Sequence, residues 1–381
     1  MTKRHVEIAV YALFIAVIML APLVLDSFWV NRLAKYLVFG MLGIAVALSW
    51  GYAGILNLGQ GLFFGGGAYM LAMSLKLASQ TSLQQGSDKP VPDFMLWNAE
   101  PGSQTDLCCI NKASFLWLPF QNQWFGVAMG LIVPVAIAGV IGAIVFRKRI
   151  SGVFVSIITL ALVLLVRLVV IDAQPVTNGF NGLTDLGWFK VLGLEFDPYI
   201  VPTYYLVAVS LSLVLVGARL LVETRAGIIL QAVRDDQNRA RYLGFDVTSY
   251  QTFFFAVSAA ITGFAGMLYV IVSEFASPTF MDLTFSITMV VWAAVGGRAS
   301  ILGACIGAIL INLISATVSE TEGFAEAWKA IIGLIFVLVV LYLPRGLAGL
   351  AHDLVDRVVT GKSDSATRAL RVTDPSSQLA E

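Results

Sequence analysis

The chain has 381 residues, of which 58% are hydrophobic and 13% are charged, and its 24 basic side chains balance its 24 acidic ones. Soluble domains are about 45–50% apolar and about 25% charged, so the composition excludes an ordinary soluble protein. Long continuous apolar runs predict membrane-spanning helices, because a membrane β-barrel shows alternating segments of about ten residues instead. The balanced charge gives no reason to expect a nucleic-acid partner.

Apolar segments of helical length follow one another along the chain, and they predict an all-α polytopic membrane protein with about ten transmembrane helices. The first segment follows Lys3, Arg4 and His5, and no small-residue cleavage site comes after it, so we expect an uncleaved span. The segments cover residues 8–25, 36–50, 52–75, 125–146, 150–171, 201–222, 252–272, 284–297, 300–318 and 328–343.

The distribution of Lys and Arg predicts the orientation of these spans. With the amino terminus in the cytoplasm, the loops on that side hold most of the basic residues, as the positive-inside rule requires. We therefore expect both termini to be cytoplasmic. Residues 1–350 form the predicted membrane domain, with an extracytoplasmic loop at 76–124, a second outer segment at 172–200, and a polar, disordered cytoplasmic tail at 351–381.

Residues 51–69 read GYAGILNLGQGLFFGGGAY, with seven glycines among apolar and aromatic residues. Two interpretations stay open: close packing of helices through small residues, or a discontinuous span beside a substrate path. In the second, Asn57 and Gln60 are path residues, because uncharged amides are costly in hydrocarbon unless they face a polar cavity. The candidate helix breaks are Gly59, Gly61, Gly65, Gly66 and Gly67, with a second glycine turn at Gly296 and Gly297.

Residues 223–250 form a charged segment between two apolar runs and read ETRAGIILQAVRDDQNRARYLGFDVTSY. A compact charged helix-loop is a suitable contact for a soluble partner, through complementary charge. We predict that Arg234, Asp235, Asp236 and Gly244 form a cytoplasmic element that couples the chain to an ATPase, with Gly244 ending a short helix. The alternative is an ordinary solvated loop.

Motifs for catalysis are missing from the sequence. The two histidines, His5 and His352, lie near chain ends, and the Gly361-Lys362-Ser363 triplet lacks the first glycine of a phosphate-binding loop. We therefore expect no catalytic residue, no metal and no cofactor. Arg167 lies inside a predicted span, but no Asp or Glu does, which argues against an ion-coupled secondary carrier. The three cysteines, Cys108, Cys109 and Cys305, have no metal-ligand spacing.

Four motifs in order resemble the permeases of branched-chain-amino-acid-type ABC importers, M-type subunit, over about residues 30–350. They are GYAGILNLGQGLFFGGGAYMLAM, the segment AVRDDQNRARYLGFDVTSYQTFFFAVSAAITGFAGMLY, VVWAAVGGRASILGACIGA and YLPRGLAGL. The resemblance implies the helical membrane domain of ribose-type importers in a bacterial plasma (inner) membrane. It also implies a homologous second permease, two cytoplasmic ATP-binding subunits and an extracytoplasmic substrate-binding protein.

Within that family, the sequence is most similar to the second permease of the urea importers, through VPDFMLWN (91–98), FLWLPF (115–120) and QPVTNGFNGLTD (174–185). Urea is small and neutral, so its path needs uncharged hydrogen-bonding groups. Thr177 and Asn178 join Asn57 and Gln60 as candidates for such a path. Branched-chain amino acids or short amides remain alternative substrates, and a stand-alone urea channel or a secondary carrier is the alternative class.

Overall fold

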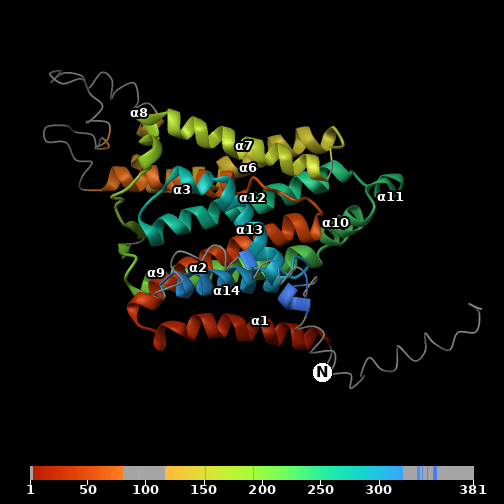
Figure 1. Cartoon of the computed structure of the whole chain (residues 1–381), viewed down its shortest axis with the longest axis horizontal. Helices are drawn as coiled ribbons and strands as arrows, with labels where there is room; N and C mark the ends of the chain where they lie inside the picture. The colour runs from red at the N-terminus through yellow and green to blue at the C-terminus, as the bar shows by residue number, and fades with distance from the viewer. Residues whose placement is uncertain are drawn as a thin grey trace, which may run out of the picture.

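The computed structural model describes residues 3–79, 116–150, 152–191 and 193–320, with a few single positions near 92–94 and 333–349. Over these residues the chain is a bundle of long helices that run roughly along one axis (Figure 1). The expected all-α membrane fold is confirmed. The predictions for Cys108, Cys109 and the tail at 351–381 lie outside the described residues, and only four single positions of the expected span at 328–343 are described.

The elements before residue 182 are α1 (Lys3–Leu20), η1 (Ala21–Leu23), α2 (Ser27–Val46), the π-helix η2 (Ala47–Tyr52), α3 (Gln60–Ala78), η4 (Leu118–Gln121), α6 (Gln123–Arg147), α7 (Val153–Asp172), α8 (Gln174–Thr177) and η5 (Gly179–Asn181). Those after it are β1 (Phe189–Val191), β2 (Leu194–Phe196), α9 (Val201–Glu223), α10 (Arg225–Asp235), α11 (Gln237–Tyr242), α12 (Val247–Ser273), η6 (Pro278–Met281), α13 (Leu283–Gly296) and α14 (Ile301–Glu320).

Eight of the described helices are long and apolar enough to cross a membrane, and α13 is a shorter apolar helix of 14 residues. The count therefore differs from the expected ten. One reason is that a 14-residue helix rises only about 21 Å, which is less than a bilayer core. The other is that only four single positions of the tenth expected span, 328–343, are described.

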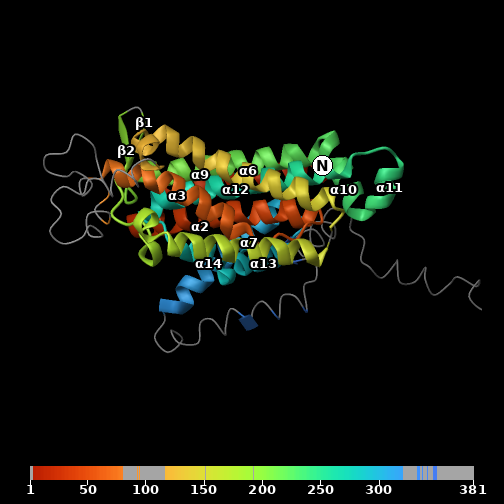
Figure 2. The ribbon, with the colours of Figure 1, turned by 90° about the horizontal axis from the view of Figure 1, so that it is seen from above.

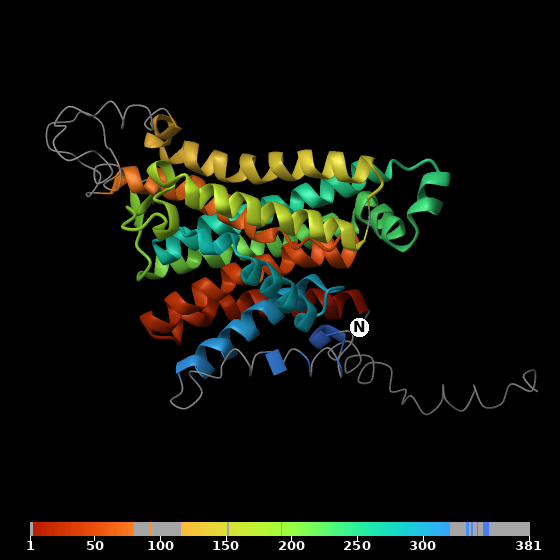
Figure 3. The ribbon, with the colours of Figure 1, turned by 45° about the horizontal axis from the view of Figure 1, so that its top comes forward.

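The bundle is built around α2, α3 and α12, whose apolar stretches are mostly buried. Figure 3 shows α6 and α7 (yellow) on one side of this core, and α1 (red) and α14 (blue) on the other. The α1 helix is almost entirely exposed, which suits a helix that faces lipid. It meets α9 at both of its ends, where the Tyr204 hydroxyl donates to the Ile18 carbonyl at 2.8 Å and Arg219 pairs with Glu7 at 2.7 Å.

Helix α3 continues without interruption through Gly61, Gly65, Gly66 and Gly67, so the prediction that these four break the helix is wrong. At three of them the absence of a side chain permits close packing. A Cβ on Gly67 would lie 2.1 Å from the Gly263 carbonyl oxygen of α12. A Cβ on Gly61 or Gly65 would lie 2.6 Å from an atom of Ser286 or Met281. These glycines let the backbones approach, as small residues do in membrane bundles.

The two ends of the bundle carry different structures. Figure 2 shows α10 and α11 at one end, and the β1–β2 hairpin at the other. The hairpin pairs Phe189 with Phe196 and Val191 with Leu194 in antiparallel register. The same end holds α8 (Figure 1). Helix α3 extends to Ala78, so the loop expected from residue 76 begins after a buried Lys76, whose amino group donates to the Thr184 carbonyl at 2.9 Å.

Candidate functional site

Between α2 and α3 the chain leaves the helical path, and we call residues 47–59 the break segment. Its first part is the π-helix η2, a rare form that is often found at functional sites. Gly54 has φ of +69°, which glycine adopts without a steric penalty. The remainder runs along α7, where the Ser156 hydroxyl donates to the Leu56 carbonyl at 2.7 Å. A discontinuity therefore lies at the predicted place, and Gly59 marks its end as the N-cap of α3.

Asn57 lies buried in the break segment, with 2% of its surface exposed. Its Oδ1 accepts a hydrogen bond from the Gly59 N–H at 2.8 Å, but its Nδ2 has no hydrogen-bond partner among the described residues. An unpaired buried donor costs roughly 1–3 kcal/mol, so such a group calls for a partner from outside the chain, such as water or a solute. Of the four predicted path residues, Asn57 best fits that role.

Gln60, in contrast, is fully buried and fully paired. Its Nε2 donates to the Ser258 hydroxyl at 2.9 Å, and its Oε1 accepts from the Thr262 hydroxyl at 2.9 Å. Ser258 in turn donates to the Ala45 carbonyl at 2.8 Å. The amide therefore joins α3 to α12 and, through Ser258, to α2, and in this state it presents no free group to a solute.

Thr177 and Asn178 lie at the opposite end of α7 from Asn57. The Thr177 hydroxyl donates to the Ala173 carbonyl at 2.9 Å, and Asn178, in the left-handed region at φ of +61°, donates to the Gly182 carbonyl at 2.7 Å. Thr159, against which the break segment packs, precedes the end of α7 by 13 residues, or about 20 Å. The structure therefore does not bring the four predicted path residues together.

We expect Gln60→Leu to lower the stability of the bundle more than Asn57→Leu. Gln60→Leu removes two hydrogen bonds that link buried helices, and each contributes about 0.5–1.5 kcal/mol. Asn57→Leu removes one local bond. Thermal unfolding in detergent would measure the difference. The matched control is Gln231→Leu in α10, where the amide makes one 3.4 Å contact within its own helix and little change is expected. Equal stability of all three variants would contradict the assigned role of Gln60.

Between α9 and α12 the charged segment folds into two short helices, α10 and α11. Asp236 is the N-cap of α11, and its carboxylate accepts from the Asn238 and Arg239 N–H groups at 2.9 and 3.0 Å. These hydrogen bonds, the one from Arg239 first, lower the pKa of Asp236. Because the lowered pKa favours the carboxylate, the cap is present at neutral pH and weakens only as the pH falls through that pKa.

Gly244 ends α11, as predicted. Its φ is +87°, its N–H bonds to the Arg241 carbonyl, and the next N–H, from Phe245, bonds to the Ala240 carbonyl. This pair of bonds is a Schellman motif. Beneath the two helices, Val233, Ala240 and Val247 form a small apolar core separate from that of the bundle. The segment is therefore a folded unit rather than a loose solvated loop.

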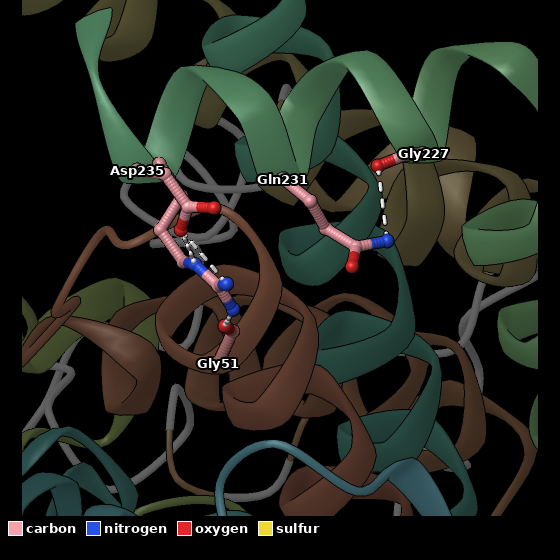
Figure 4. Close-up of polar contacts among 5 residues, drawn as sticks. Gly51, Gly227, Gln231 and Asp235 are labelled. Carbon is pink, nitrogen blue, oxygen red and sulfur yellow. Dashed lines mark hydrogen bonds and ion pairs between the residues drawn. The ribbon is translucent and has the colours of Figure 1, made fainter. Parts of the chain in front are cut away.

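Arg234 and Asp235 end α10, and Asp235 lies near Gly51 of the bundle (Figure 4). The Nη1 of Arg234 donates to the Gly51 carbonyl in η2 at 2.7 Å, while its Nη2 lies 2.9 Å from the Asp235 carboxylate. The prediction treated Arg234, Asp235 and Asp236 as charges offered to a partner. In the structure, all three have partners within the chain.

The outward surface of the segment carries apolar side chains that the sequence analysis missed. Tyr242 is 92% exposed and Leu243 is 71% exposed, at the end of α11. Neither lies in a helix of membrane-spanning length. The available signal was an apolar pair that directly follows the charged run 234–241 and precedes a helix-ending glycine.

The break segment also contacts the turn between α13 and α14. The Tyr52 hydroxyl donates to the Ala299 carbonyl at 3.0 Å, and the Arg298 guanidinium lies 4.9 Å from the centre of a Trp50 ring. A Cβ on Gly51 would overlap the Arg298 carbonyl oxygen. At this turn α13 ends at Gly296, and Gly297 follows with φ of +111°. The second predicted glycine turn thus packs on the break segment.

Within the described residues, no group of three or more His, Cys, Asp or Glu side chains could hold a metal ion. Cys305 is buried in α14 as a free thiol, where it packs against α2 at Gly40. The site therefore consists of an interrupted helix pair, a buried amide and a folded charged segment.

These features define a multi-pass α-helical membrane protein whose core is interrupted next to a folded polar segment. The chain belongs to the family described as branched-chain amino acid transport system / permease component, whose model matches residues 28–340. The description of this family as a permease component agrees with the expectation of a membrane subunit.

Curated relatives support the same family. The chain is 29% identical over 259 residues to the high-affinity branched-chain amino acid transport system permease protein LivM of Escherichia coli, covering 59% of each chain. It is 24% identical to the ribose import permease protein RbsC of Haemophilus influenzae, over 56% of this chain and 67% of that one. The chain thus spans about 59% of the length of the first curated relatives it matches. No solved structure matches.

Proposed function

We propose that this chain is a permease subunit of an ATP-driven importer of small polar solutes. The observation that carries the proposal is the exposed apolar pair Tyr242 and Leu243 on a rigid two-helix unit outside the spans. Such a pair is a suitable anchor for a soluble partner, because exposed apolar side chains on a fixed surface mark interaction sites. In this proposal the partners are two ATP-binding subunits, a homologous second permease and an external substrate-binding protein.

The proposed orientation places α10 and α11 in the cytoplasm. The described start of the chain and α10 lie at the same end of the bundle (Figure 1), and basic residues are enriched in the segments assigned to that side. Residues 76–124 and 172–200 then face outward, where a substrate-binding protein would dock. Residues 1–350 are the proposed membrane domain, in a bacterial inner membrane, and residues 351–381 are a cytoplasmic tail.

Urea is the substrate we propose first, because residues 91–98, 115–120 and 174–185 resemble the urea branch of the family. The unpaired Nδ2 of Asn57 is chemically suited to donate to a urea carbonyl oxygen. A branched-chain amino acid is the second candidate. It is supported by the family description and by the relative named for branched-chain amino acid transport.

The test is uptake by liposomes that contain the complete complex with both permeases, the ATP-binding subunits and the binding protein encoded beside them. We expect ATP-dependent accumulation of labelled urea and little of labelled leucine. Leucine uptake in place of urea would transfer the assignment to the second candidate. Liposomes with this chain alone are the control, and rapid urea flux there without ATP would show a stand-alone channel and overturn the importer proposal.

A further inference from the structure

The structure links the two-helix unit to the break segment through one side chain. Arg234 ends α10, and its Nη1 donates to the Gly51 carbonyl at 2.7 Å. The side chain is about one-third exposed, at 34%, and the pair with Asp235 at 2.9 Å fixes its guanidinium. A Cβ on Gly54 would lie 2.8 Å from the Arg234 Cγ, so the aliphatic part of Arg234 also packs on the break segment.

The partner of Arg234 is an unusual stretch of backbone. Gly51 belongs to the π-helix η2, in which the i→i−4 pattern of hydrogen bonds is replaced. A carbonyl in such a stretch can accept from a side chain without the loss of a regular helical bond. Ile55 N–H bonds back to the Ser49 carbonyl at 2.7 Å, which closes the end of the π-helix. A second arrangement of this buried segment would therefore have to exchange a defined set of hydrogen bonds, among them those at the Gly51 and Ser49 carbonyls.

The break segment leads directly to the buried amides of the site. Asn57 follows Gly51 by six residues, and Gln60, three residues further on, begins α3. A displacement of Gly51 would therefore move the backbone on which Asn57 stands, while Gln60 stays bonded to Ser258 and Thr262 in α12. The turn at Ala299 moves with the segment if the bond from Tyr52 persists.

We propose that Arg234 is a positioning residue that transmits motion of α10 to the break segment, and through it to Asn57. This inference rests on the proposed function, because it supposes that an ATP-binding subunit moves α10. The guanidinium suits the task, since its planar group donates to Gly51 and to Asp235 at the same time. Through this hydrogen bond, movement of α10 is coupled to the break segment, and the two arrangements of the break segment are the states that the coupling links.

The test is ATP-dependent hydrogen–deuterium exchange of the complete complex, read separately for peptides over residues 225–245 and residues 47–59. In the unmodified complex we expect ATP to change exchange in both. In Arg234→Gln, which is too short to reach Gly51, we expect the change at 225–245 to remain and the change at 47–59 to disappear. Uptake by the Arg234→Gln complex should fall about tenfold, because a charge-assisted hydrogen bond is lost. Its rate of ATP hydrolysis should stay within about twofold of that of the unmodified complex.

Two further variants separate this role from a general effect on folding. Arg234→Lys keeps a donor for Gly51 and should restore part of the response at 47–59. Arg239→Gln is the matched control, because the Arg239 side chain is 80% exposed and its Nε is 3.7 Å from the Asp236 carboxylate, a long ion pair, so both responses should persist. An unchanged response at 47–59 in Arg234→Gln, or none there in the unmodified complex, would overturn the inference. No response at 225–245 in the unmodified complex would instead refute the proposed function.

Discussion

Gly67→Ala is expected to destabilise the bundle strongly. A Cβ at this position would lie 2.1 Å from the Gly263 carbonyl oxygen and 2.6 Å from its carbon, both in the backbone of α12. Backbone atoms cannot rotate away, so α3 and α12 would have to separate along the contact that forms the centre of the bundle. Overpacking of this kind typically costs about 1–3 kcal/mol, and occasionally more. The measurement is the fraction of monodisperse protein left after heating in detergent.

Gly66→Ala is the matched control, because it makes the same change one residue earlier in the same helix. The nearest atom to a Cβ there is Pro134 Cγ at 4.0 Å, an ordinary van der Waals distance. Removing a glycine from a helix interior gains up to about 1 kcal/mol, so Gly66→Ala should be neutral or slightly stabilising. Equal loss in both variants would mean that α3 and α12 do not cross at Gly67.

Replacing Tyr242 and Leu243 together by alanine should remove the ATP-binding subunits from the complex. The two side chains are 92% and 71% exposed, so truncation costs the isolated chain little. At an interface, loss of an aromatic anchor commonly costs about 2 kcal/mol or more, which is over tenfold in affinity. Co-purification of the ATP-binding subunits with the permease measures the effect, and the thermal stability of the permease should be unchanged.

Leu213→Ala provides the comparison for that result. Leu213 is 69% exposed, as much as Leu243, but it lies in the membrane-spanning helix α9. We expect the ATP-binding subunits to remain bound to this variant, and also to the single variant Arg239→Ala at the same end of the bundle. If the variant that lacks both side chains still retained the ATP-binding subunits, Tyr242 and Leu243 would not be their anchor. The main support for the proposed function would then be lost.

Composition and the local pattern of apolar residues were enough to predict the class of fold. Twenty apolar residues in a row have no stable alternative to a helix in a bilayer, because each backbone polar group must be paired within the segment. The helix end at Gly244 was also predictable, since a short helix followed by glycine has a strong local preference for that geometry. Membership in the permease family followed from motifs that remain contiguous in the sequence.

The glycine-rich stretch was predictable only in part. A break between α2 and α3 does occur, but Gly65, Gly66 and Gly67 continue the helix. Whether a glycine interrupts a helix or lets a neighbour approach depends on what packs against it. Here the Gly263 carbonyl of α12, almost 200 residues away in the chain, decides the role of Gly67.

The roles of the polar side chains were set by tertiary structure for the same reason. Gln60 and Asn57 are both amides in one short stretch of sequence. Gln60 is paired to α12, yet the Nδ2 of Asn57 has no partner in the part of the chain that the structure describes. Arg234 reads as a surface charge, but it bonds to the Gly51 carbonyl, 183 positions away in sequence. Sequence alone determined that this chain crosses a membrane in helices and which family it joins, because those properties are local or contiguous. Only the folded chain decided which polar groups are paired, because hydrogen-bond satisfaction depends on neighbours that the sequence does not place next to one another.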